Sequence, residues 1–250
     1  MSQASSEKGE RLQVVLAKLG IASRRGVVSM IEAGEVSVNG VTVKEKGFRV
    51  YPSRDEILVG GEPVSADSLG EKRYFMLNKP KGVMTTLQDP HAERTVADFF
   101  KGISTRLFPV GRLDRDTTGL LLMTNDGELA FRLTHPKFGI KKRYHACVQG
   151  VVTEKEAQKL EKGVLLEEEK TAPCQIKIEK IEPLQTSLFV TLHEGKKRQI
   201  RRIFDKIGHR VLELERLSYG TLSLGDLRRG HKRELLPQEI KALYKATGLI

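Results

Sequence analysis

The sequence predicts an α+β protein of two domains, and three features of the chain predict it. Short apolar segments with β-type alternation are mixed irregularly with amphipathic helical segments, a pattern typical of α+β folds rather than regular parallel βαβ arrays. The 250 residues exceed one average domain of about 150. A polar stretch also divides the chain. We therefore expect a disordered tail at 1–9, a small domain at 10–64, a linker at 65–72 and a larger domain at 73–250.

The small domain is predicted to begin with two helices and to continue with a β-hairpin. Apolar residues at i, i+3, i+4 and i+7 mark a helix over 12–19. Ser23 is placed to cap a second helix that runs to about Ala33. Asn39 and Gly40 suit the two left-handed positions of a tight turn. The strands expected around and after this turn lie at 36–38, 41–43, 48–50 and 57–59.

The larger domain is predicted to contain a sheet that is covered on both faces. The continuous apolar run at 119–124 is typical of such a buried strand. A second buried strand begins at Arg73 and is interrupted by Lys79-Pro80-Lys81-Gly82. Further strands are expected at 144–148, 174–181 and 187–192, and helices at 128–134 and 154–162.

The charge of the chain indicates a polyanionic partner. Lys and Arg number 43 against 32 Asp and Glu, a net charge of +11. Residues 1–70 hold nine basic and nine acidic side chains, so the whole excess belongs to residues 71–250. A membrane surface is the weaker alternative, since no basic amphipathic helix with a Trp-anchored face is present and the chain lacks Trp. Nucleic acid is therefore the expected partner.

Several classes of protein are excluded by the motifs that the sequence lacks. Cys147 and Cys174 form no CxxC pair, and the six histidines never occur at metal-ligand spacing. No stretch approaches the roughly 20 apolar residues of a membrane span, and the first residues contain no apolar signal-peptide core. We expect no metal, no small-molecule cofactor, no membrane partner and a cytoplasmic location.

The segment GRLDRDTTG at 111–119 is the first candidate for chemistry. It is a glycine-bounded turn directly before a buried strand, and it carries Arg112, Asp114 and Asp116. Loops held on a rigid strand are favoured places for catalytic groups. The alternative is that Asp114 or Asp116 merely accepts backbone hydrogen bonds in an Asx-turn.

The segment EGKKRQIRRIFDKIGHR at 194–210 is the second candidate. It holds seven basic residues and two acids, and its isoleucines and Phe204 form one apolar helical stripe. Arg198, Arg201 and Arg202 then project from the other faces. Together with Lys196 and Lys197 they suit phosphate contacts, although an ordinary solvated helix face is the alternative.

The segment IKKRYHACV is the third candidate, because Tyr144 follows a basic cluster at the start of a strand. RNA-binding proteins commonly stack unpaired bases on aromatic rings, and Lys141, Lys142 and Arg143 lie beside the tyrosine. The alternative is a strand tyrosine whose hydroxyl reaches the surface.

Together these segments resemble one enzyme family. The strings LNKPKGVMTT, GRLDRDTTGLLLMTNDGELAFRLTHP, KKRYHACVQG and EGKKRQIRRIF are similar to the successive motifs of pseudouridine synthases of the RsuA/RluB type. The N-terminal unit resembles the S-four-type RNA-binding domain that precedes the catalytic domain in that family. The resemblance covers the chain from about residue 10, favours the RluB-like branch, and implies a mixed, largely antiparallel central sheet with flanking helices.

The resemblance also implies roles for individual residues. Asp114 matches the catalytic aspartate, and Arg112 the arginine of the same motif. Tyr144 matches the tyrosine that packs against the target base, and Arg201 the basic residue that pairs with the aspartate. The sequence departs slightly from the family where Ile203 replaces a more usual methionine. Whether the aspartate attacks the sugar, attacks the base or abstracts a sugar proton stays open.

The function implied is isomerisation of a specific uridine in ribosomal RNA, with large-subunit RNA favoured over small-subunit RNA. A non-catalytic RNA-binding or ribosome-assembly protein on the same scaffold is the alternative. The chain is expected to act as a monomer. The expected RNA contacts are basic side chains of both domains: Arg24, Arg25, Lys79, Lys81, Lys141, Lys142, Lys196, Lys197, Arg198 and Arg202.

Overall fold

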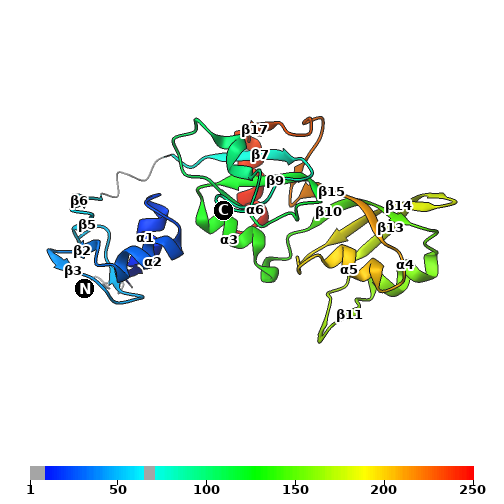
Figure 1. Ribbon diagram of the computed structural model, residues 1–250, viewed down its shortest axis with the longest axis horizontal. Coiled ribbons are helices and arrows are strands. Elements are labelled where there is room, and N and C mark those ends of the chain that lie inside the picture. The colour runs from blue at the N-terminus through cyan, green and yellow to red at the C-terminus, as the bar shows by residue number, and fades with distance from the viewer. Residues whose placement is uncertain (1–8, 65–70) are drawn as a thin grey trace. The chain divides into compact units, whose positions relative to one another are not determined.

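The computed structural model describes residues 9–64 and 71–250, which form two compact units (Figure 1). One unit contains the chain up to Lys72 together with Ser104–Arg106, and the other contains Arg73–Ile103 and Leu107–Ile250. The disordered tail expected at 1–9 lies, except for Gly9, outside the described residues. The same holds for residues 65–70 of the expected linker.

The N-terminal unit packs two helices against a four-stranded sheet of order β3-β2-β5-β6. Its core consists of apolar side chains from both helices and from the strands, among them Leu12, Leu16, Val27, Ile31, Val36 and Ile57. The elements are β1 (Glu10–Arg11), α1 (Leu12–Lys18), α2 (Arg24–Glu32), β2 (Val36–Val38), β3 (Val41–Thr42), β4 (Arg49–Val50), β5 (Ile57–Val59) and β6 (Glu62–Pro63).

Two local signals in this unit form the structures that the sequence predicts. The Ser23 hydroxyl accepts a hydrogen bond of 3.0 Å from the Gly26 N–H and so caps α2. Asn39 and Gly40 have φ values of 50° and 78°, the left-handed pair that a tight hairpin turn needs.

The larger unit is built on a sheet whose main path runs β13-β14-β10-β15-β9-β7-β17. Neighbouring strands are antiparallel, except that β15 runs parallel to β9, so the expected mixed, largely antiparallel sheet is confirmed. The path consists of β7 (Tyr74–Lys79), β9 (Thr118–Thr124), β10 (Lys142–Gln149), β13 (Gln175–Glu182), β14 (Gln185–Leu192), β15 (Val211–Tyr219) and β17 (Lys232–Glu234). The sequence pattern did not indicate the central strand β15.

Helices cover both faces of this sheet. Leu121 and Met123 of β9 belong to one core cluster, whereas Leu120 and Leu122 belong to another, as expected for a strand covered on both sides. The first cluster includes α4 (Glu154–Glu161) and α5 (Gln199–Asp205), and the second includes α3 (Gly127–Thr134) and α6 (Pro237–Ala246). The remaining short elements are η2 (Val96–Phe100), β8 (Phe108–Pro109), η3 (Pro136–Phe138), β11 (Leu165–Leu166), β12 (Glu169–Lys170) and β16 (Leu222–Ser223).

Within residues 9–64 and 71–250, no helix has the length and apolar character that crossing a membrane requires.

Candidate active site

The loop of residues 111–117 holds Asp114 at the start of β9, in the centre of the larger unit. Leu113 is 5% exposed and anchors the loop in the core. The Thr85 hydroxyl fixes it further, because it donates to Leu113 O at 2.7 Å and accepts from Leu113 N at 3.3 Å. Among the described residues, no backbone N–H donates to the carboxylate of Asp114, so the Asx-turn alternative does not account for this residue.

The Lys79–Gly82 turn packs against this loop and is hydrogen-bonded to it. Lys79 is fully buried, and its ammonium donates to Val83 O at 2.8 Å and to Pro80 O at 3.1 Å. The Gly82 N–H in turn donates to Arg115 O at 2.8 Å. Burial lowers the pKa of Lys79 from 10.5 to about 8. The expected RNA contact of Lys79 is therefore wrong, since this inward position of β7 keeps the ammonium away from solvent.

Gly119 lets β9 approach β15 closely. Its φ is +100°, and a Cβ built on it would lie 2.3 Å from the carbonyl oxygen of Arg216. Only glycine accommodates both the backbone angle and this approach. The Gly119 position of the motif therefore brings Asp114 and the residues of β15 into one site.

Helix α5 supplies the basic residues beside Asp114. Arg198 precedes the helix, and its Nη1 lies 3.9 Å from Asp114 Oδ2 and 3.3 Å from Asp116 Oδ1. Arg201 is buried and pairs with Asp116, at 3.1 Å between Nη2 and Oδ2. Arg201 also donates to Val211 O at 3.0 Å and to Asp116 O at 3.2 Å.

These contacts correct the pairing expected for Arg201. The ion pair of Arg201 is with Asp116 rather than with Asp114, and Arg198 is the arginine within 4 Å of Asp114. Three contacts to the loop and to β15 hold the Arg201 side chain inward, although helical periodicity had placed it on an outer face. Burial lowers the pKa of Arg201, and the charge of Asp116 opposes that shift.

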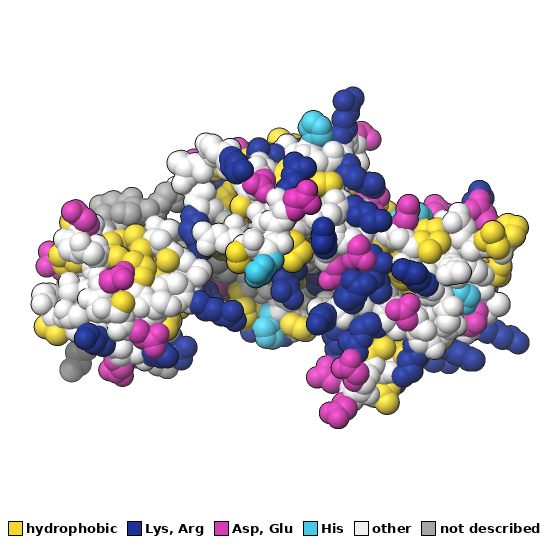
Figure 2. Space-filling model, viewed as in Figure 1, with side chains coloured by type: hydrophobic (Ala, Val, Ile, Leu, Met, Phe, Trp, Pro, Cys, Tyr) yellow, Lys and Arg dark blue, Asp and Glu magenta, His cyan; other side chains and the backbone are white. Residues whose placement is uncertain are grey.

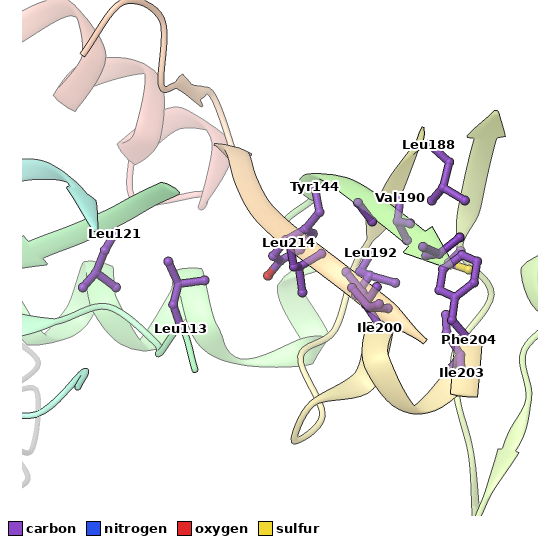
Figure 3. Close-up of a cluster of buried hydrophobic side chains, with 14 of the residues drawn as sticks. Leu113, Leu121, Tyr144, Leu188, Val190, Leu192, Ile200, Ile203, Phe204 and Leu214 are labelled. Carbon is purple, nitrogen blue, oxygen red and sulfur yellow. The ribbon is translucent and has the colours of Figure 1, made fainter. Parts of the chain in front are cut away.

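A pocket of about 420 Å³ opens beside Asp114. Tyr144 is 9% exposed and lines it, so the surface alternative for this tyrosine does not hold. Leu113, Tyr144 and Leu214 belong to the same core cluster, in which Figure 3 shows Tyr144 next to Leu214. The lining of this pocket includes Asp114, Lys142, Tyr144, Arg198, Leu214 and Arg216.

A second, more open hollow of about 640 Å³ meets the first one at Asp114. Arg112, Asp114, Lys197 and Arg198 line both, and the exposed side chain of Lys81 also reaches the second. Asp114 therefore lies where the pocket meets a surface groove lined by basic side chains.

The other predicted RNA contacts divide by exposure. Lys141 and Lys197 are exposed, whereas Lys142 is only 7% exposed and lies in the pocket wall, where it can reach RNA only through a nucleotide that enters the pocket. The inward orientation of alternate residues of β10 is the reason. Arg24 and Arg25 are exposed on α2 and line a separate hollow of about 440 Å³ in the N-terminal unit.

An acidic hairpin neutralises part of the basic surface. Lys196 Nζ lies 2.7 Å from Glu169, and Arg202 Nη2 lies 2.8 Å from Glu167. These glutamates belong to the β11–β12 hairpin, whose acidic tip lies beside a group of basic side chains in Figure 2. Lys197 and Arg198 are more exposed than either of these two paired residues.

Sequence reasoning missed Arg216. It is 2% exposed, occupies the middle of β15, lines the pocket, and donates from Nε to Leu120 O at 2.7 Å. The available signal was an arginine within a segment of β-type composition that alternates toward the core, because a strand seldom buries an arginine that has no partner. In the described part of the chain, no group of three or more His, Cys, Asp or Glu side chains could hold a metal ion.

The chain belongs to the RNA pseudouridylate synthase family. Residues 73–206 match that family, and residues 10–57 match the S4 domain family. The α+β fold with an N-terminal RNA-binding domain and the expected kind of enzyme are thereby confirmed.

The relatives that the chain matches over most of its length confirm the expected similarity to the RluB-like branch of the family. Ribosomal large subunit pseudouridine synthase B of Bacillus subtilis strain 168 is 48% identical over 236 residues, covering 94% of this chain and 95% of that protein. The protein of the same name from Pseudomonas aeruginosa is 39% identical over 249 residues, covering 96% of this chain and 63% of that protein. A crystal structure described as pseudouridylate synthase matches with a TM-score of 0.67 at 32% identity, covering 94% and 99% of the two chains.

Proposed function

We propose that this chain converts one uridine of large-subunit ribosomal RNA to pseudouridine and that Asp114 is its catalytic aspartate. The observation that carries the proposal is the position of Asp114, whose partly exposed carboxylate stands where the Tyr144 pocket meets the basic groove. The names of the two relatives from B. subtilis and P. aeruginosa support ribosomal RNA of the large subunit as the substrate.

The shape of the site supports a flipped nucleotide. The target uracil enters the 420 Å³ pocket and packs against the Tyr144 ring, while the neighbouring phosphates stay in the open groove. Extrusion of a base from its stack costs a few kcal/mol. Contacts of the phosphates with Lys81, Lys197 and Arg198 offset that cost, because exposed basic side chains neutralise phosphate charge.

Asp114 is the group that acts on the reacting nucleotide. It serves either as a nucleophile that attacks the sugar or the uracil, or as the proton acceptor that removes a proton from the sugar. Arg198 lies 3.9 Å from its carboxylate, and the ion pair of Arg201 with Asp116 fixes the loop. Arg112, exposed beside Asp114, contacts the RNA strand at the groove.

The N-terminal unit provides a second RNA contact through Arg24 and Arg25. Its segment of the sequence is formally neutral, so it orients the substrate while the larger unit supplies most of the electrostatic attraction. We expect the protein to act as a monomer, without a cofactor, in the cytoplasm where ribosomes are assembled.

The proposal is tested by mapping carbodiimide-dependent reverse-transcription stops over ribosomal RNA from cells with and without this protein. We expect one stop in large-subunit RNA to disappear and to return with the wild type or with Lys177→Met, a control on the exposed part of β13. Asp114→Asn should not restore it. A stop lost from small-subunit RNA would correct the substrate, and no lost stop would favour the non-catalytic RNA-binding alternative.

A further inference from the structure

Two cationic side chains lie side by side in the wall of the Asp114 pocket, on neighbouring strands. Lys142 begins β10 and Arg216 lies in β15, which pairs with β10 in antiparallel register. Both side chains face the ring of Tyr219, with Lys142 Nζ at 5.4 Å and the Arg216 guanidinium carbon at 4.8 Å from its centroid. The exposed fractions are 7% for Lys142 and 2% for Arg216, so both charges are almost completely buried.

No carboxylate among residues 9–64 and 71–250 forms an ion pair with either cation. Arg216 Nη2 is buried and has no hydrogen-bond partner among these residues. Glu194 attracts Lys142 from the loop after β14, but its Oε1 accepts hydrogen bonds from Ala172 N at 2.9 Å and from Gln199 Nε2 at 2.6 Å.

Burying a charge without a counter-ion costs free energy, because the protein interior replaces its hydration poorly. Two like charges beside each other add electrostatic repulsion to this cost. An anionic group that enters the pocket offsets the cost. A flipped nucleotide enters base first, so the group that reaches these buried positions is the base, and the phosphates remain with the exposed lysines and arginines of the groove.

We propose that Lys142 and Arg216 bind the carbonyl oxygens of the target uracil and hold the negative charge that this base carries while it is detached from the sugar. The inference rests on the proposed pseudouridine synthase activity and assigns to it two further catalytic residues.

The charge arises from the reaction itself. When the C1′–N1 bond breaks, its electron pair leaves with N1 and spreads over O2 and O4 of the uracil. The positive charge at C1′ is removed by bonding to the Asp114 carboxylate or by loss of the C2′ proton. After rotation, a C5–C1′ bond forms as the bond between C1′ and the Asp114 carboxylate breaks or, on the other route, as the proton returns to C2′. The C5 proton is then lost and N1 gains a proton. Uracil and its isomerised product are neutral, so fixed cations in the pocket stabilise the intermediate more than either end state.

The fixed cations also retain the base. A detached uracil has no covalent tether, and its escape would leave an abasic site in the RNA. Two buried cations in the pocket wall, together with the Tyr144 ring, hold the anion while it turns.

The experiment compares full-length wild type with Lys142→Met, Lys142→Arg, Arg216→Met and the control Lys177→Met. Tritium release is measured in a single turnover from large-subunit RNA labelled at C5 of uridine, with enzyme in saturating excess, and RNA affinity is measured by filter binding. We expect Lys142→Met and Arg216→Met to slow the saturated rate by roughly 100-fold to 1000-fold, with RNA affinity within about 3-fold of the wild type. Lys177→Met should match the wild type.

The pH profile provides a readout that a merely structural role would not change. Burial, followed by the neighbouring charge of Arg216, lowers the pKa of Lys142 to about 8, and Glu194 opposes this shift. Tyr219 faces Lys142 as well, and its pKa is raised above the ordinary value by burial. The wild-type rate should therefore fall as the pH rises through about 8, whereas Lys142→Arg should retain its rate to higher pH.

Three results are distinguished. An inactive wild type would overturn the proposed function itself. An active wild type with an unchanged saturated rate in a folded Lys142→Met variant would overturn the role of the buried cations. Weaker RNA binding, a smaller salt dependence and an unchanged saturated rate would assign Lys142 to a phosphate instead, and would also contradict the proposal.

Discussion

Arg201 pairs with Asp116, at 3.1 Å between Nη2 and Oδ2, and this ion pair joins helix α5 to the loop that carries Asp114. Asp114, two residues earlier, is left with Arg198 at 3.9 Å. The two aspartates of the GRLDRDTTG motif therefore have different tasks. Asp116 fixes the loop, and Asp114 keeps its carboxylate available at the pocket.

This division predicts unequal losses of stability for two equivalent substitutions. Asp116→Asn should lower the free energy of unfolding by about 1–2 kcal/mol, because charged hydrogen bonds to two arginines are weakened. Asp114→Asn should change it by less than about 0.5 kcal/mol, since its contact with Arg198 is long and partly exposed. Urea unfolding of both variants measures the difference, and equal losses of stability would contradict it.

Gly119 should be the glycine of the site that tolerates a side chain least. Gly119→Ala would force β9 and β15 apart, since its Cβ would lie 2.3 Å from Arg216 O, and we expect a loss of about 3–5 kcal/mol. Gly230→Ala is the control, because its φ of +81° is similar but nothing lies within 4 Å of the added carbon. It should cost only about 1–2 kcal/mol. Thermal unfolding that ranks the two variants in the opposite order would disprove the close packing.

Lys79 should make stability depend on pH in the alkaline range. Its pKa is about 8 in the folded protein and 10.5 when unfolded, so the unfolded chain binds more protons between these values. Stability relative to Lys79→Met should therefore be lowest below pH 8 and should rise, by a few kcal/mol, as the pH approaches 10.5. Urea unfolding of both proteins over this range gives the difference, and parallel curves would show that Lys79 is not buried as a cation.

The acidic β11–β12 hairpin should weaken RNA binding. Glu169→Gln releases Lys196 from its 2.7 Å ion pair, so RNA affinity should rise by about 2-fold to 5-fold at low salt. Lys197→Met should lower affinity and reduce the slope of log affinity against log salt by about 0.7, the value for one phosphate contact on a single strand. Filter binding over a salt series tests both, with Lys177→Met as the control; a slope unchanged by Lys197→Met would remove this residue from the RNA surface.

Local signals predicted much of this fold. The Ser23 cap, the Asn39-Gly40 turn and the buried strand at 119–124 depend on residues close together in the sequence, and each is found where the pattern placed it. Helix α5 likewise has Ile200, Ile203 and Phe204 in the core. Such features follow from periodicity and turn preferences, which neighbouring residues determine.

Features that depend on distant parts of the chain were predicted less well. Lys79 and Lys142 have the residue type of surface RNA contacts, but tertiary packing buries Lys79 and turns Lys142 into the pocket wall. Arg201 pairs with Asp116 instead of Asp114 because of the way α5 is rotated about its axis where it packs on the loop. No local sequence pattern specifies that rotation. Arg216 enters the site only because β15 pairs in parallel with β9, and parallel pairing of distant strands leaves little trace in the sequence.

The central claim is that Asp114 performs the isomerisation and is not merely part of an RNA-binding surface. The most direct measurement is tritium release from large-subunit RNA labelled at C5 of uridine, for wild type and Asp114→Asn, with RNA affinity measured on the same preparations. We predict release by the wild type, none above background for Asp114→Asn, and affinities within about 3-fold of each other. Release by Asp114→Asn at a rate near that of the wild type would contradict the account.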